Sequence, residues 1–299
     1  MSTRINHNIL SLTGQRAIWT TQRELDTAVQ RLSTGLRINY AWDDPTGLGI
    51  SERFRAAISG MQEAQKNANY DINMLQTAEG ALGVIDEKLI RMRAIAVQAS
   101  NGILTTLDRQ IANVEFQQLK SEVDRIANVT NYNGFRLLDG TRAADTASTD
   151  STMALGYNLV STAGSATAIK FHIGDNNIAG LDYYFVNLGG MTASALGLAD
   201  LQIADTASAQ TAVDSIMSAI NSKDVERTFI GSLVERLQNT VLNLMISQES
   251  ATASESTIRD ADFASEMSEF TRAQILMQTG MSMLAQANML PQTIAQLVG

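Results

Sequence analysis

Side chains that could perform chemistry are few in this chain, and none of them forms a known catalytic spacing. The sequence has no cysteine and two histidines, His7 and His172, and neither histidine has a zinc-type partner at helical spacing. No Gly-x-Ser-x-Gly elbow, Walker loop or glycine-rich dinucleotide turn occurs, and two histidines leave few places for a Ser-His-Asp triad. We therefore predict that the chain is not an enzyme and that it holds no catalytic residue, cofactor or metal.

The remaining charged and apolar groups argue against nucleic acid and membrane partners. The net charge is −9, and Arg91 with Arg93 is the nearest approach to a basic cluster, so we expect no nucleic acid. The segment Met1–Arg4 lacks an apolar signal core, and no apolar run is long enough to span a bilayer. We expect neither a classical secretion signal nor membrane insertion. Asp43 and Asp44 could hold a cation, but we interpret them as helix caps.

The most regular helical pattern begins at Asp44-Pro45, where the acid can cap the helix and the proline fits its first position. Apolar and small residues then recur in fourteen steps over 49 residues, a mean of 3.5, which is a coiled-coil period. A helix from Pro45 to Ser100 would be roughly 80 Å long and needs equally long partners. Asn101-Gly102 ends it, and a second helix is predicted from about Thr106 to Val129. The apolar face of the second helix is predicted to comprise Ile111, Val114, Leu119 (or Gln118), Val123 (or Glu122) and Ile126.

Strand patterns occupy the middle of the chain, after a predicted turn at Asn131–Gly134. Ile169, Phe171 and Ile173 alternate with polar residues, and Asp182–Leu188 is a second candidate, so a small β-hairpin is expected. Met153–Val160 is a candidate third strand. Helical periodicity then returns as a short helix near Ala209–Ser222, followed by a long one through Ile230 and Ile258. An antiparallel pairing of residues 45–100 with 225–257 would bring the two chain ends to one pole.

Both ends of the chain carry helical apolar stripes with nothing local to pack on. Such stripes require partner helices, which indicates assembly rather than chemistry. We predict a mainly α fold: a long antiparallel helical coiled-coil bundle with a small β-hairpin subdomain, and both termini paired as helices. The residues predicted to pack in a core between subunits are Ile5, Ile9, Leu12, Leu25, Leu32, Leu36, Phe263, Met267, Phe270, Met277, Met281 and Leu284.

Several long motifs, in order along the chain, resemble one known family. They are Arg31–Asn39 followed by Asp43-Asp44 and Gly47, then Asn67–Asn69, Gln76–Leu82, Arg91–Gln98, Asn133-Gly134, Arg272–Leu276 and Leu284–Gln292. With these motifs the chain resembles a bacterial flagellin, the subunit of the motility filament. The resemblance implies a structural subunit that polymerises into the flagellar filament, a secreted and extracellular helical propeller for swimming.

The resemblance also implies a division into domains. Residues 1–42 and 258–299 would form a terminal helical inner domain in the filament core, and 43–257 an outer helical bundle. Residues 135–200 of the outer domain would be its β-hairpin and loop subdomain. Met191–Leu198 is similar to the family's usual return from that hairpin, which leaves no room for an inserted domain and implies a minimal flagellin.

Partners follow from the same resemblance. They are other copies of the chain in a helical homopolymer, the flagellar export apparatus, an export chaperone on the C-terminal arm, and the hook-junction and cap proteins. Arg91 and Glu115 match positions that matter in flagellins recognised by Toll-like receptor five, with Ile95 as a further possible contact. The match around them is partial, because Ile90, Ala94 and Ile95 stand where Gln, Glu and Leu are usual.

Two other functions compete with a filament subunit. A hook-filament junction protein shares flagellin-like termini, although Asn288–Gln292 favours flagellin itself. A soluble coiled-coil adaptor would form dimers that stop growing. Serine and threonine residues within 141–168 could accept glycans, but a solvated loop has the same composition, so the sequence leaves that question open.

Overall fold

The computed structural model describes residues 8–141 and 168–298, so the expected third strand at 153–160 and the serine- and threonine-rich segment fall largely or wholly outside it. The chain divides into two compact units: Met1–Ile58 with Glu249–Gly299, and Ser59–Gln248. The bounds 1–42, 43–257 and 258–299 stay a prediction. Among the described residues, no helix is both long enough and apolar enough to traverse a bilayer.

Helix α2 (Pro45–Ala99) begins where the sequence predicted. The Asp44 carboxylate accepts hydrogen bonds from the backbone N–H groups of Thr46 and Gly47, at 3.1 and 2.8 Å, and so satisfies two donors of the first turn. The predicted heptad stripe becomes the buried face of the helix. Its fully buried members include Ala68, Leu75, Ala78, Leu82, Ile85, Leu89, Met92, Ala96 and Ala99.

Helix α3 (Thr106–Val129) has the predicted bounds but a different buried face. Thr105 and Asp108 form a reciprocal capping box at its start. Phe116 is fully buried, together with Val123 and Ala127, whereas the side chains of Ile111 and Val114 are exposed. The predicted face is therefore wrong at its first two positions. The side of α3 that faces the core is the one that carries Phe116, Val123 and Ala127.

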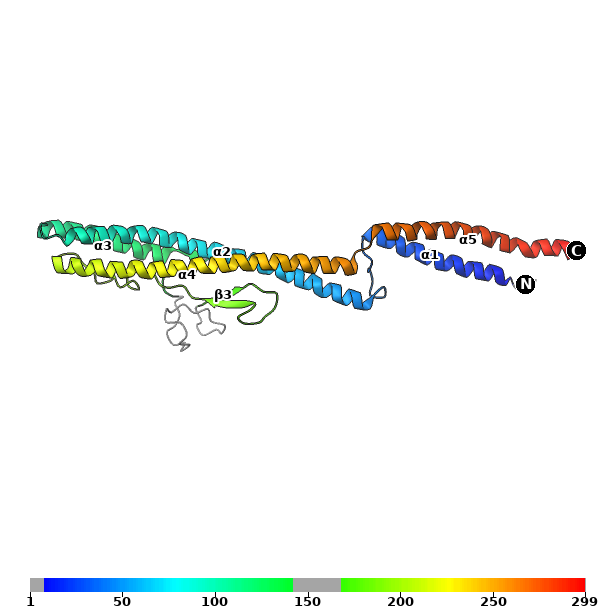
Figure 1. Cartoon of the computed structure of the whole chain (residues 1–299), viewed down its shortest axis with the longest axis horizontal. Coiled ribbons are helices and arrows are strands. Elements are labelled where there is room, and N and C mark those ends of the chain that lie inside the picture. The colour runs from blue at the N-terminus through cyan, green and yellow to red at the C-terminus, as the bar shows by residue number, and fades with distance from the viewer. Residues whose placement is uncertain (1–7, 142–167, 299) are drawn as a thin grey trace. The chain divides into compact units, whose positions relative to one another are not determined.

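Helix α4 (Thr206–Arg259) is a single continuous helix rather than the predicted short helix and long helix. Its polar centre is buried and partnered: Lys223 Nζ lies 2.6 Å from an Asp86 carboxylate oxygen on α2. Hydrogen bonds from Gln65 to Gln248 and from Arg227 to Glu79 join the same two helices. Residue numbers rise along α2 as they fall along α4, which confirms the antiparallel pairing (Figure 1).

Two small antiparallel sheets complete the described part of the outer unit. Strands β1 (Asn131–Tyr132) and β2 (Phe135–Arg136) flank a tight turn in which Asn133 and Gly134 both have positive φ, of 49° and 81°. Strands β3 (Ile169–His172) and β4 (Tyr183–Val186) form the expected hairpin, with Phe171 opposite Tyr184. Phe171, Tyr184 and Val186 are buried, so one face of this hairpin belongs to the helical core.

The terminal unit is built on helices α1 (Ile9–Thr34) and α5 (Phe263–Val298), which lie side by side (Figure 1). Asn8 caps α1, and Gly35 ends it in the left-handed conformation, with φ of 71°. Just beyond, the backbone N–H of Arg37 donates to the Arg259 carbonyl at 2.7 Å, and that of Ala261 donates to the Gly35 carbonyl at 3.0 Å. These two bonds join the segment that follows α1 to the segment that precedes α5.

Replacing Phe116 by alanine should lower the free energy of unfolding by about 3–5 kcal/mol, because the buried ring leaves a cavity between helices. The measurement is guanidinium unfolding of the monomeric full chain, followed by circular dichroism. Val114→Ala, on the exposed face of the same helix, should change the free energy by less than about 0.5 kcal/mol. Equal effects of the two substitutions would contradict the observed orientation of α3.

Candidate assembly surface

The most deeply buried residues between α1 and α5 are small. Ala28 on α1 and Ala273 and Ala287 on α5 are buried, at 3–4% exposure. A Cβ atom added to Gly280 would lie 3.1 Å from the Ile18 side chain. Because small residues let two backbones approach closely, the pair closes while the described large apolar side chains of both helices stay partly or largely exposed.

Polar side chains fix the register of this pair. Asn8 Nδ2 donates to the Ala287 carbonyl at 2.8 Å, near the start of α1. Toward its end, the Arg31 guanidinium lies 3.0 Å from a Glu266 carboxylate oxygen. Since residue 8 meets residue 287 and residue 31 meets residue 266, the two helices run antiparallel.

The predicted packing residues divide into two groups. Ile9, Leu12, Phe263, Met267 and Met281 are exposed; Ile9, Leu12 and Phe263 have exposed fractions of 61%, 59% and 67%. The others are partly covered: Leu25, Leu32, Leu36, Phe270, Met277 and Leu284. Ile5 lies outside the described residues. The predicted packing residues that the structure describes therefore keep much of their apolar surface uncovered in a single chain. A surface that binds further copies of the chain requires this exposure.

Exposed apolar residues also lie off the predicted stripes. They are Leu10 on α1 and Ile275, Leu276, Met283 and Met289 on α5, whereas Trp19 and Val29, which are also exposed, belong to the predicted N-terminal stripe. A helix that is apolar on more than one side is normally buried on more than one side. The signal was visible in the sequence as apolar residues adjacent to the stripe positions of α5, and it indicates contacts with more than one neighbouring helix.

The residues that could have held a cation have structural roles. The Asp43 carboxylate accepts from the backbone N–H groups of Asn39 and Tyr40, and Asp44 caps α2. The His172 ring stacks on Tyr183 with centroids 5.9 Å apart. Across residues 8–141 and 168–298, no three His, Asp or Glu side chains are grouped as metal ligands; His7 is outside these ranges.

Arg91 and Glu115 come together on the surface of the outer unit. The Arg91 Nε and Nη2 atoms both donate to Glu115 Oε1, at 2.8 and 2.6 Å, and both side chains are about half exposed. Ile95 does not join them: it is 2% exposed and packs in the helical core, because it falls on the buried side of α2. The expected contact at Ile95 is therefore corrected, and the accessible pair is Arg91 with Glu115.

Comparison with known proteins identifies relatives along almost the whole chain. The family model for the bacterial flagellin N-terminal helical region matches residues 5–143, and that for the bacterial flagellin C-terminal helical region matches 211–298. A flagellin of Bacillus subtilis (strain 168) is 40% identical and covers 99% of both chains. A flagellar filament 33 kDa core protein of Treponema phagedenis is 37% identical, covering 98% of this chain and 99% of its own.

A solved structure shares the fold. A putative flagellar hook-associated protein from Vibrio parahaemolyticus aligns with a TM-score of 0.54 and 17% identity, over 73% of this chain and all of that chain. At this level of identity the similarity concerns architecture and does not transfer a role.

Proposed function

This chain belongs to the bacterial flagellin family and is a structural subunit of the flagellar filament, and we propose that α1 and α5 form its inner, subunit-joining domain. The family is one of filament proteins rather than enzymes, and its filament lies outside the cell. The observation that carries the proposal is the closure of the α1–α5 pair through small residues, which leaves large apolar side chains such as Leu12 and Phe263 exposed.

The free-energy balance of the terminal helices favours assembly. Ordering a helix costs roughly 1–2 kcal/mol per residue in backbone entropy. Within the described part of the pair, the fully covered apolar side chains are alanines, whose burial contributes little free energy. Burial of a large apolar side chain returns about 1.5–3 kcal/mol, so neighbours that cover Ile9, Leu12 and Phe263 supply what the isolated pair lacks. Folding of the chain ends is thus coupled to polymerisation.

The geometry of the polymer follows from the kind of contact. When one patch of a subunit meets a different patch on the next copy, the assembly grows as an open helix unless the rotation closes. The apolar side chains on several sides of α5 provide for such contacts with more than one neighbour. Many modest contacts then make a stiff tube, and small changes in packing between copies give a propeller its alternative shapes.

Export and capping partners complete the proposed function. An arm that folds on assembly can pass the flagellar export apparatus unfolded, with a chaperone on the C-terminal segment that becomes α5. Hook-junction proteins would meet the first subunits and the cap the last, through the same terminal surfaces. The absence of cysteine means that no disulfide has to be broken for this passage.

A second proposed contact is with Toll-like receptor five. The supporting observation is the exposed Arg91–Glu115 pair, which presents a cation and an anion from two adjacent helices. An exposed pair of this kind contributes little to folding, so both groups are available to a partner that covers them.

The terminal amides provide the first test of coupled folding. In the monomer, the amides of 8–34 and 263–298 should exchange hydrogen rapidly, and in the filament they should be slowed by about two orders of magnitude or more. The α2 amides should be protected in both states, which serves as the internal control. Protection of α1 and α5 in the monomer equal to that in the filament would contradict the coupling.

Leu12→Ala should raise the critical concentration for filament growth by about tenfold or more, because a side chain buried between copies is shortened. The measurement is sedimentation of protein seeded with filament fragments, with electron microscopy of the pellet. Gln15→Ala, an exposed polar position on the same helix, is the matched control and should assemble as the parent does. Growth that stops at dimers in the parent protein would instead indicate a coiled-coil adaptor.

Arg91→Ala should weaken receptor signalling by about tenfold or more, as expected for loss of a central charged contact. The measurement is the dose response of reporter cells that express Toll-like receptor five, treated with monomeric protein. Arg93→Ala, two residues away and also exposed, should retain the parental dose response. Equal curves for all three proteins would exclude Arg91 as a receptor contact, and a parent protein that gives no signal would exclude the receptor as a partner.

A further inference from the structure

Two buried polar atoms without a hydrogen-bond partner lie on the β3–β4 hairpin and on the neighbouring helix α2. Tyr184, on β4, is 2% exposed, and its hydroxyl has no hydrogen-bond partner. Asp71, on α2, is half-buried, and its Oδ2 atom is also buried without a partner. A buried polar atom without a partner costs about 1–3 kcal/mol, so each of these two atoms requires an explanation.

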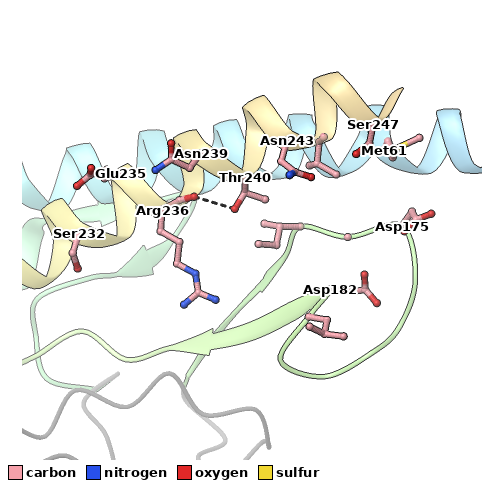
Figure 2. A pocket seen from close by; sticks show the side chains of 14 residues that line it. Met61, Asp175, Asp182, Ser232, Glu235, Arg236, Asn239, Thr240, Asn243 and Ser247 are labelled. Carbon is pink, nitrogen blue, oxygen red and sulfur yellow. Dashed lines mark hydrogen bonds between the residues drawn. The ribbon is translucent and has the colours of Figure 1, made fainter. Parts of the chain in front are cut away.

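A cation from helix α4 lies over the ring of Tyr184. The Arg236 guanidinium carbon is 4.7 Å from the centre of the Tyr184 ring. Figure 2 shows Arg236 extending from α4 toward the hairpin, along a groove of about 810 Å³ that is lined by α4 and the turn between β3 and β4. On α2, the Asn67 side-chain amide donates to the His172 carbonyl at 3.3 Å, one helical turn before Asp71, so this stretch of α2 lies beside the hairpin that carries Tyr184.

Burial favours the neutral, protonated forms of Asp71 and Tyr184. Burial raises the pKa of Asp71 to about 7. Burial also raises the pKa of Tyr184 to about 12, while Arg236 lowers it and the Asp71 charge raises it. Tyr184 therefore remains a phenol at physiological pH, and Asp71 is the group that titrates.

The other charged groups around the hairpin face elsewhere or already have partners. On β3, the Lys170 ammonium lies 3.8 Å from the Tyr183 ring centre and His172 stacks on the same ring, on the opposite face of the hairpin from Tyr184. On α2, Lys66 pairs with Glu63. The groove itself is lined by Glu235 of α4 and by Asp175 and Asp182 of the hairpin turn. Among the described residues, no cation forms an ion pair with Asp71.

We propose that Asp71 and Tyr184 form a proton-operated latch that holds the β3–β4 hairpin on α2 and α4. When the Asp71 carboxyl is protonated, it is a neutral donor that can bond the Tyr184 oxygen directly or through one water molecule, so both orphaned atoms gain a partner. When Asp71 loses its proton, an uncompensated charge is left in the seam and the docking of the hairpin is weakened. The latch is a property of the outer unit and does not depend on how the terminal helices assemble.

The sign of the pH effect follows from proton linkage. The docked state binds the Asp71 proton more tightly than the released state, in which the carboxyl recovers its ordinary pKa of 3.8. Docking is therefore strongest below about pH 4 and weakens by up to tenfold per pH unit as the pH rises to about 7, above which it levels off. The hairpin is therefore loosened between acidic and neutral pH, and a further rise in pH has no additional effect.

The test measures hydrogen exchange at the β3–β4 backbone amides of the full chain between pH 4 and pH 9, converted to opening constants. The parent protein should show the pH dependence above. Asp71→Asn, which mimics the protonated acid in shape and donor capacity, should keep the hairpin docked at every pH. Asp200→Asn, an exposed acid outside the hairpin, is the matched control and should behave as the parent does.

Two further measurements separate a latch from a structural contact. Tyr184→Phe keeps the ring under Arg236 but removes the hydroxyl, so it should weaken docking below about pH 7 and leave it unchanged above, whereas a purely structural role would weaken docking throughout. The carboxyl carbon of Asp71, followed by NMR in the parent protein, should titrate near 7. Titration near 4, or an unchanged pH dependence in Asp71→Asn, would overturn the proposal even if one variant failed to fold.

Discussion

The close contact of α1 with α5 constrains the rest of this protein's behaviour. Alanine and glycine residues at Ala28, Ala273, Gly280 and Ala287 let the two backbones meet, and that choice leaves Ile9, Leu12 and Phe263 facing outward. A seam of large side chains would have stabilised the single chain and removed the need for neighbours. The small-residue seam does the reverse, because it fixes the partner helix while postponing most of the apolar burial until other copies arrive.

The outer unit follows the opposite rule, because the buried lysine and glutamate of α4 have their partners within the same chain. Lys223 is almost completely buried on α4 and lies 2.6 Å from Asp86 on α2, while Glu226 accepts the backbone N–H of Gly189 at 2.9 Å. Removing one partner from a buried charge costs about 3–5 kcal/mol, so sliding α4 along α2 is strongly penalised. These contacts set the register of a pair whose apolar seam alone would permit several.

Local signals in the sequence predicted where helices and turns begin better than they predicted which side of each helix is buried. Asp44-Pro45 and Asn133-Gly134 identify a helix start and a turn because each acts through its own backbone, without reference to distant segments. The face of α3 could not be found in this way, since Phe116 and Val114 are equally apolar and only the packing of α2 and α4 selects between them. The continuity of α4 was missed for a related reason: the polar residues around Lys223 resemble a break until their partners across the seam are known.

Asp71 shows how a site can remain invisible in sequence and still follow from physics. It stands immediately before Ile72 in the heptad stripe of α2, where an acidic residue is ordinarily solvated. The hairpin beside this part of α2 comes about 100 residues later in the chain, and its strand β4 carries Tyr184, whose hydroxyl has no bonding partner. Each residue alone would be destabilising in that seam, but a shared proton gives both a partner. A contact that is complete in one protonation state and incomplete in the other ties the position of the hairpin to pH, which a fully apolar seam would not do.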